Sequence, residues 1–420
     1  MVIFVPLCNP MKSKRNFIGF IWHAFWLALA ETFAEKNTVL PGLILLGGGT
    51  QSDVGILTSI MIGVPLISQL LFASYLTNKS KKKNFLLFGI YLRVSAFIGV
   101  ALSIYYFEYF AETTFVLVIF IWMTLFSVSG AFANVSYTDI VGKSFDALTR
   151  KKFFVFRQFI TGIGIFVSAV IVKQILSSIK YPDNYQVAFF TAGGLLFIAA
   201  FGFILLKEKP SQISQRYKNI LEVIKAIPGE IKKSDNLKNF IIATNLIGIT
   251  FVLIPFYVGF VQNKIEITEE VIGTFLVIQI TGMIISNLLW HRLVKKFSFK
   301  GMLRMTIIIN AILPIAALAL VTFENITLFY ILFFLNGSAI SAQKIAYEGV
   351  LVEISNESNR PLYTGIFGTL NLATMIVPLL IGTLIVSIGY TILFAVLPVI
   401  TLSALYFVNK MVCPIDLEKS

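Results

Sequence analysis

The residues best suited to chemistry in this sequence are ionisable side chains that interrupt long apolar stretches. Glu31 and Glu35 are four residues apart in one such stretch, a spacing that places both carboxylates on one face of a helix. Two carboxylates so close together at low dielectric constant cannot both ionise easily, so one is expected to hold a proton. The pair is therefore a candidate for proton uptake and release. The adjacent Lys36 could bind an anionic group or pair with Glu35.

Lys344 and Glu348 repeat this spacing in a second apolar stretch. They could neutralise one another or pair with charges on the first stretch, which lowers the cost of burial, or they could act in function. Asn134, Asn245 and Gln279 could hydrogen-bond a small solute, or could hold neighbouring helices together. The spacing alone leaves these alternatives open.

The composition indicates which elements position these residues. Hydrophobic residues make up 57% of the 420 residues and charged residues 13%, and the mean hydropathy is +0.85. A water-soluble chain of this composition would lack the polar groups to cover its surface, whereas a lipid environment suits it. The apolar runs are continuous rather than short and alternating, so an all-α integral membrane protein is predicted, not a β-barrel.

Several classes of function are excluded by the same residues. The net charge of +13 could indicate nucleic-acid binding, but the basic residues form short clusters between apolar runs, so no nucleic-acid partner is expected. The two histidines, His23 and His291, and the two cysteines, Cys8 and Cys413, have no metal-ligand spacing. No Walker phosphate loop is present. We therefore expect no metal, no cofactor and no enzyme activity.

Helices that cross a bilayer need about 20 apolar residues. Twelve segments meet this requirement, at approximately 17–46, 53–77, 84–106, 113–140, 153–178, 186–206, 238–262, 269–294, 301–322, 326–354, 362–387 and 389–410. Threading them in order places the basic clusters on one side, which by the positive-inside rule is the cytoplasm. A multi-pass protein of the cell membrane with both termini in the cytoplasm is predicted. Met11, which precedes a basic run and the first segment, is an alternative start to Met1.

The only long polar segment divides the chain almost in half. We predict a six-helix bundle over 1–206, a cytoplasmic linker over 207–237 and a second six-helix bundle over 238–420. A short amphipathic helix over 220–227 is predicted inside the linker, where a regulatory or partner-binding role is an alternative to a simple connection.

Two connections in equivalent positions of these halves can be aligned. The run Gln69–Lys83 follows the second span, and the run Asn287–Gly301 follows the eighth. An amide, a Leu-Leu-aromatic run, a serine and a trailing base coincide. Duplicated six-helix halves joined by a long linker are a recurring transporter architecture.

On these grounds the sequence resembles the major facilitator superfamily over essentially its whole length. The family signature Gly-x-x-x-Asp-Arg-x-Gly-Arg-Arg is matched only at its basic end, with Thr77 and Lys295 at the Asp position and Ser80 and Ser298 at the second Gly. Because this Asp is missing, the sequence departs from the charge relay that, in this family, usually helps to hold the two halves together. The runs NTVLPGLILLGG, RKKFFVFRQF and RPLYTGIFGTLN are also similar to a bacterial subgroup of uncharacterised facilitator-type transporters, a resemblance that brings no substrate with it.

The resemblance implies that spans 1, 4, 7 and 10 line a central cavity, which is where most of the polar candidates above fall. It also implies a cytoplasmic gate, for which the candidates are Lys81, Lys82, Asp139, Arg150, Arg157, Lys295 and Lys300. The expected function is secondary transport of a small solute by alternating access, with a proton or another ion as the coupling partner and the monomer as the functional form. The alternative is a membrane scaffold, sensor or lipid-handling protein that has kept the fold without transport.

Overall fold

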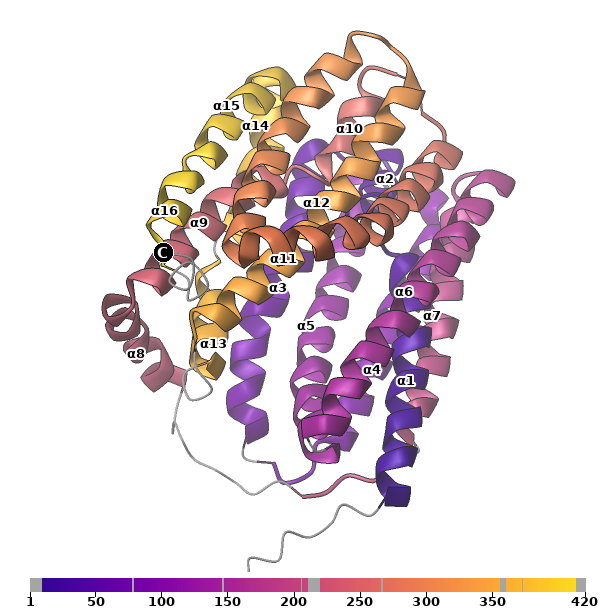
Figure 1. Cartoon of the computed structure of the whole chain (residues 1–420). Helices are drawn as coiled ribbons and strands as arrows, with labels where there is room; N and C mark the ends of the chain where they lie inside the picture. The colour runs from indigo at the N-terminus through magenta and orange to yellow at the C-terminus, as the bar shows by residue number, and fades with distance from the viewer. Residues whose placement is uncertain are drawn as a thin grey trace, which may run out of the picture. The chain divides into compact units, whose positions relative to one another are not determined.

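The computed structural model describes residues 10–77, 79–145, 147–204, 206–210, 220–265, 267–355, 360–371 and 373–412. Within these ranges the regular structure is helical, as Figure 1 shows. The helices are α1 (Pro10–Thr32), α2 (Val39–Leu46), α3 (Gln51–Thr77), α4 (Lys83–Tyr105), the short 3₁₀ helix η1 (Phe107–Tyr109), α5 (Glu112–Ser144), α6 (Ala147–Ser178), α7 (Asp183–Ile204), α8 (Ile220–Lys233), α9 (Asp235–Phe251), α10 (Phe256–Gln262), α11 (Glu269–Val321), α12 (Ile326–Glu353), α13 (Arg360–Leu370), α14 (Ala373–Ile388), α15 (Tyr390–Leu402) and α16 (Ala404–Lys410).

Eleven segments of the described chain are long and apolar enough to cross a membrane. They coincide with the second to twelfth predicted spans, and the ends differ by up to eight residues. The predicted first span, 17–46, is formed by two helices, α1 and α2, with a turn between them. The chain is therefore an all-α, multi-pass membrane protein, as its apolar composition requires.

Spans in corresponding positions of the two halves are discontinuous. In the first, the chain leaves helical geometry after Thr32 and resumes it at Val39. In the seventh, α9 ends at Phe251 and α10 begins at Phe256, directly after Pro255. Paired interruptions of this kind mark the substrate region in many transporters, because they free backbone polar groups near the middle of the membrane.

The eighth and ninth spans lie in one assigned helix, α11, which is kinked at Ser298. The φ and ψ angles of Ser298 are 62° and 176°, a backbone conformation that is almost confined to glycine. Ser298 aligns with the second Gly of the family signature, so the kink explains why a glycine is preferred at that position.

The described structure divides into two compact units. Unit 1 comprises Met1–Ala34, Ile67–Tyr109 and Val118–Ile220, and unit 2 comprises Glu35–Leu66, Phe110–Leu117 and Leu221–Ser420. The predicted division into halves at 207–237 concerns the sequence repeat and stays a prediction. The two units do not follow this division, because two segments of the first half, Glu35–Leu66 and Phe110–Leu117, belong to the same unit as the helices of the second half.

Within unit 1, α7 packs against α1 and α4, and α6 packs against α1. Aromatic residues from four helices fill the space between them: Phe20 lies edge-on to Tyr137, Phe153 and Phe203, at centroid distances of 5.2, 5.7 and 5.6 Å. This cluster fixes α1 against α5, α6 and α7 and so sets the position of the polar residues further along α1.

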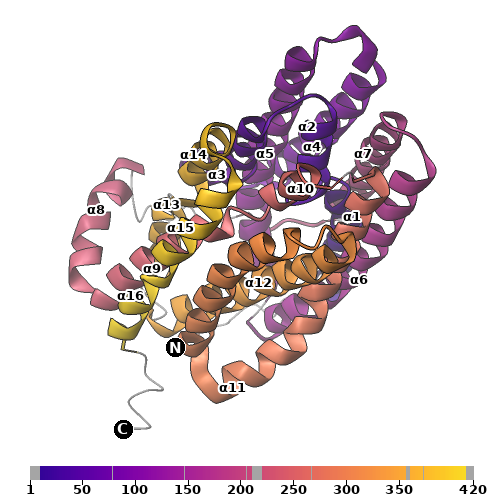
Figure 2. The same ribbon diagram turned by 90° about the horizontal axis from the view of Figure 1, so that it is seen from above.

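Within unit 2, the short helix α2 packs against α10, and Figures 1 and 2 show the two next to each other. All seven residues of α10 except Gln262 are buried, as are the first six of α2. The start of α3 also lies against α14, because Gly55 leaves room for the carbonyl of Pro378 and Gly382 leaves room for the carbonyl of Gln51. The α2–α10 contact joins the second segments of spans 1 and 7, and the α3–α14 contact joins spans 2 and 11.

Candidate functional site

An ion pair between α1 and α4 is the central polar feature of unit 1. Nη2 of Arg93 donates to Oε1 of Glu31. The Arg93 side chain is 9% exposed and that of Glu31 is 48% exposed. Charges inside membrane spans are expensive unless they are paired or face water, so this pair is a strong functional candidate.

The position of Arg93 is set by α5. Its guanidinium carbon lies 4.2 Å from the centroid of the Phe126 ring, a distance typical of a cation–π contact. Gly130, one turn further along α5, presents no side chain, so the guanidinium approaches the helix backbone. Nε of Arg93 is buried without a hydrogen-bond partner. The guanidinium is thus held in place with part of its donor capacity unused.

The four-residue spacing predicted that Glu31 and Glu35 share one face of a helix. They do not, because α1 ends at Thr32, before Glu35. The carboxylate of Glu35 accepts hydrogen bonds from the backbone N–H of Asn37 at 2.8 Å, from the Asn37 side chain at 2.8 Å and from the Thr38 hydroxyl at 3.0 Å. Glu35 therefore satisfies the backbone of the turn that breaks span 1. Lys36, next in the chain, is half-buried.

The three amide candidates have different surroundings. Asn134 is exposed on α5. Asn245 on α9 donates to the carbonyl of Leu370 at 2.9 Å and accepts from the N–H of Ala373 at 2.9 Å, so it binds the backbone on both sides of the break between α13 and α14. Gln279 on α11 is buried, and its Oε1 has no hydrogen-bond partner. Of the two roles considered for Asn245, binding a solute or holding helices together, these contacts correspond to the second.

Lys344 and Glu348 are both exposed on α12, one turn apart. No ion pair joins them in the described part of the chain. One interpretation of their spacing was that the two charges neutralise one another. In this conformation they do not.

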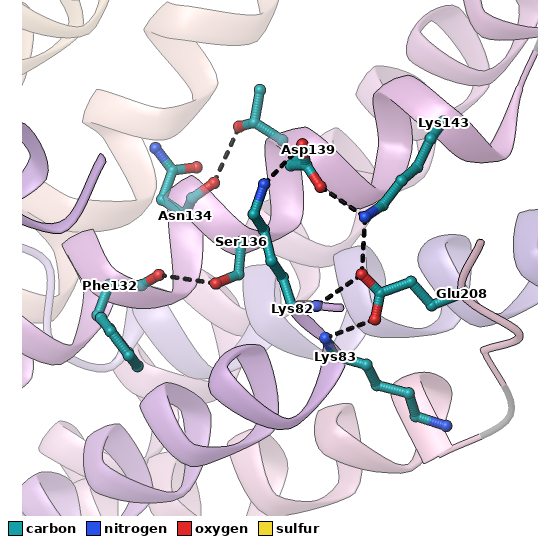
Figure 3. A network of polar contacts seen from close by, with 9 residues as sticks. Lys82, Lys83, Phe132, Asn134, Ser136, Asp139, Lys143 and Glu208 are labelled. Atoms are coloured by element: carbon teal, nitrogen blue, oxygen red, sulfur yellow. Dashed lines mark hydrogen bonds and ion pairs between the residues drawn. The ribbon is translucent and has the colours of Figure 1, made fainter. Parts of the chain in front are cut away.

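A second polar network, drawn in Figure 3, lies at the end of α5. Asp139 binds the Nζ atoms of Lys82 and Lys143 at 2.9 and 2.7 Å. Lys143 also binds Oε1 of Glu208 at 2.8 Å. The Glu208 carboxylate accepts from the backbone N–H groups of Lys82 at 2.6 Å and Lys83 at 2.8 Å.

The network caps a helix. Lys82 and Lys83 are the N-cap and first residues of α4, where backbone N–H groups have no partner within the helix and an anion is favoured. Glu208, which is 4% exposed, provides that anion from the segment after α7. It therefore supplies an acidic group near the connection between spans 2 and 3, where the family signature has an Asp and this chain has Thr77.

The remaining gate candidates are distributed as follows. Lys81 is exposed. Arg157 lies over the Tyr137 ring, with its guanidinium carbon 5.3 Å from the centroid. Lys300 is buried and donates from Nζ to the carbonyl of Met411 at 2.6 Å. The side chains of Arg150 and Lys295 lie outside the described residues.

Three important residues were missed by the sequence-based selection: Arg93, Lys143 and Glu208. Arg93 had a usable signal, since it is an ionisable residue inside the predicted span 84–106, and the rule that selected Glu31 applies to it equally. Lys143 and Glu208 follow the ends of spans, where charges are common, and their roles depend on partners far away in sequence.

Comparison with known proteins supports this structural description. The family model described as Major Facilitator Superfamily matches residues 16–263 and 239–412. The chain belongs to this family of membrane transport proteins. Comparison with curated protein sequences finds no match.

Among solved structures, the chain is similar to the nucleoside transporter NupG, with a TM-score of 0.65, 13% identity and coverage of 96% of this chain and 99% of that one. It is similar to a D-xylose-proton symporter, with a TM-score of 0.66, 14% identity and coverage of 95% and 97%. It is also similar to a POT family transporter in complex with 5-aminolevulinic acid, with a TM-score of 0.68, 13% identity and coverage of 96% and 97%. At these identities the similarity establishes the fold alone.

Proposed function

We propose that the protein is a secondary active transporter that carries a small solute by alternating access and couples its movement to a proton through Glu31. The observation that carries the proposal is the ion pair between Glu31 and Arg93, on two different spans of unit 1. The solved structures of similar fold include proteins described as carrying nucleosides or xylose, which are small solutes.

The chemistry of the pair suits coupling. Glu31 is half exposed while Arg93 is buried, so a proton can reach the carboxylate from its exposed side. Protonation removes the countercharge of a buried arginine, which is unfavourable unless another group replaces it. The protonated and ionised forms of Glu31 therefore favour different arrangements of α1 and α4, which is what coupling requires.

Alternating access is supported by the contacts inside unit 2. The start of α3 meets α14 at Gly55 and Gly382, and a side chain at either position would collide with the facing backbone. Small residues at this contact let the two backbones approach closely, and because α3 belongs to the first half of the sequence and α14 to the second, movement of one half against the other would have to open it. We take this contact as one of the gates of the transport pathway.

The membrane is proposed to be the cell membrane, with both termini in the cytoplasm, because the basic connections then lie on the inner side. The functional form is proposed to be the monomer. The network around Asp139 and Glu208 lies on that cytoplasmic side and belongs to the proposed cytoplasmic gate.

The experiment that tests the function begins with a thermal-shift screen of the purified full-length protein against metabolites and drugs. A stabilising solute is then followed into proteoliposomes with and without a pH gradient. Accumulation should depend on the gradient in the wild type and in Glu270→Gln, an exposed carboxylate on α11 that serves as control. Glu31→Gln should exchange solute but not respond to the gradient. If Glu31→Gln and Glu35→Gln both retain the response, proton coupling through this region is wrong.

A further inference from the structure

We infer that the transported solute is a small organic anion, and that Arg93 binds its carboxylate by two parallel hydrogen bonds when Glu31 is protonated. This inference rests on the proposed function, since it takes Glu31 as the proton-binding group, and it adds the chemical class of the substrate. It is carried by the donor geometry of Arg93, by the charge balance around it and by the absence of a side chain at Gly130 beside it.

The donor geometry is incomplete with Glu31 alone. Nη2 and Nε point from the same edge of the planar guanidinium, the edge that binds a carboxylate through both of its oxygens. Glu31 uses Nη2. Nε is buried and has no partner. A buried donor without a partner costs free energy, so a ligand that reaches both nitrogens gains a bond that Glu31 does not make.

The charge balance requires an anion. Among the described residues, the carboxylate paired with Arg93 is that of Glu31. Once Glu31 is neutral, the buried guanidinium has the Phe126 ring beside it but no countercharge. A sugar or nucleoside can donate and accept hydrogen bonds but cannot replace the missing negative charge. A carboxylate can, so binding of the proton and binding of the anion assist each other.

A second cation in unit 1 acts in the same direction. Arg157 lies over the ring of Tyr137, and no ion pair to it is found among the described residues. The hydroxyl of Tyr137 is buried without a hydrogen-bond partner. These two side chains add positive potential and a free donor to the same bundle as Arg93, which favours an anion over a neutral solute or a cation.

On the side of Nε, Arg93 faces α5 at a residue without a side chain. Gly130 stands there, and a methyl group added to it would lie 3.4 Å from Nε. That distance is ordinary contact, so Gly130→Ala is compatible with the fold, yet the methyl group occupies space that a ligand oxygen needs to reach Nε. Gly130→Ala should therefore hinder a ligand that binds Nε but spare the ion pair with Glu31, which is made through Nη2.

The test is calorimetric titration of the purified full-length protein near pH 6 with a fixed panel of acids: acetate, lactate, pyruvate, succinate and glutamate. Each acid is paired with its neutral amide, and inorganic phosphate and sulfate form a separate arm. Repetition in two buffers of different ionisation enthalpy measures proton uptake. We expect at least one acid to bind with uptake of about one proton, because Glu31 must be protonated to release Arg93. Its amide and the inorganic anions should bind far more weakly.

The variants assign the binding to Arg93. Arg93→Lys keeps the charge but loses the paired donors, and should weaken binding of the acid by about 30-fold or more. Gly130→Ala should weaken it without lowering thermal stability. Glu31→Gln should still bind the acid but without proton uptake. Arg304→Gln, which removes an exposed arginine on α11, is the control and should bind as the wild type does.

Three results would overturn the inference: no acid in the panel binds at millimolar concentration, acids and amides bind equally, or Arg93→Lys binds as the wild type does. Failure of the proposed function is distinguishable. If a neutral solute is accumulated by a pH gradient and Glu31→Gln abolishes the response, coupling stands and the carboxylate inference falls. If an acid binds through Arg93 but its uptake in Glu31→Gln still follows the gradient, the binding site stands and coupling through Glu31 falls.

Discussion

Asn236 binds the chain in unit 2 in the same way as Asn16 does in unit 1. Asn16 on α1 donates to the carbonyl of Lys207 at 3.1 Å and accepts from its N–H at 3.0 Å. Asn236 on α9 donates to the carbonyl of Val412 at 2.6 Å and accepts from its N–H at 2.9 Å. In each case the first span of a half holds the backbone of a residue just beyond its last span. The repeat seen in sequence is thus repeated in specific hydrogen bonds.

The first prediction concerns these two asparagines. Asn16→Ala and Asn236→Ala should each lower the free energy of unfolding by about 1–3 kcal/mol, because a backbone N–H and C=O lose their partner. Thermal unfolding in detergent would measure this as a lower midpoint temperature. Asn84→Ala, at an exposed position on α4, is the control. Equal midpoints for Asn16→Ala and the control would show that the hydrogen bonds to Lys207 contribute nothing.

The spans themselves could be predicted from the sequence because their length is dictated by the bilayer. The predicted 84–106 corresponds to Lys83–Tyr105, and the predicted 326–354 to Ile326–Glu353. The break in the first span was not predicted. Its residues are apolar enough to continue a helix, and the carboxylate of Glu35 stabilises the turn by accepting three hydrogen bonds from Asn37 and Thr38.

The candidate site could be predicted only in part. Glu31 was selected because it is a carboxylate in a span, and the neighbours considered for it were Glu35 on the same helix or the charges of the second stretch, Lys344 and Glu348. The partner is Arg93, 62 residues away in sequence and brought close because α1 and α4 both pack against α7. Spacing along a helix identifies neighbours on that helix, whereas pairing between helices depends on their rotation and depth, which no local pattern gives.

The second prediction concerns the kink at Ser298. Its φ of 62° is strained for serine and relaxed for glycine. Ser298→Gly should raise the free energy of unfolding by about 1 kcal/mol, after allowance for the greater freedom of glycine in the unfolded chain. Ser80→Gly is the matched control, because Ser80 aligns with Ser298 but is not among the described residues of positive φ. A higher midpoint for Ser80→Gly than for Ser298→Gly would contradict the assignment.

The third prediction concerns the Glu208 network. Lys143 is 16% exposed and Glu208 is 4% exposed, so their ion pair is shielded from water and should contribute more than a surface pair. A double-mutant cycle of Glu208→Gln and Lys143→Met should give a coupling free energy on the order of 1 kcal/mol or more. Lys233→Met with Glu230→Gln, a pair in which the Lys233 side chain is 73% exposed, is the comparison and should couple less. Equal coupling in both cycles would mean that the network is no more than a surface pair.

The fourth prediction tests the gate at α3 and α14. Gly382→Leu places a side chain against the backbone of Gln51 and Ser52, and should hold this contact apart. The readout is alkylation of Val258→Cys, a fully buried position on α10, in a protein without Cys8 and Cys413. We expect alkylation at least tenfold faster with Gly382→Leu, because α10 contacts Gln51 through Gly259 and separation at Gln51 exposes it. Gly162→Leu, at a position where an added Cβ would meet no other part of the described structure within 4 Å, is the control and should leave the rate unchanged.

Loss of the fold would also expose Val258, so two further measurements accompany the alkylation. The variant must keep a cooperative thermal transition. Gly55→Ala, which adds a single methyl group against the carbonyl of Pro378, should move the rate in the same direction by a smaller factor. If Gly382→Leu unfolds cooperatively, Gly55→Ala has no effect and Val258→Cys stays protected in both, the contact between α3 and α14 is a fixed part of the core and not a gate.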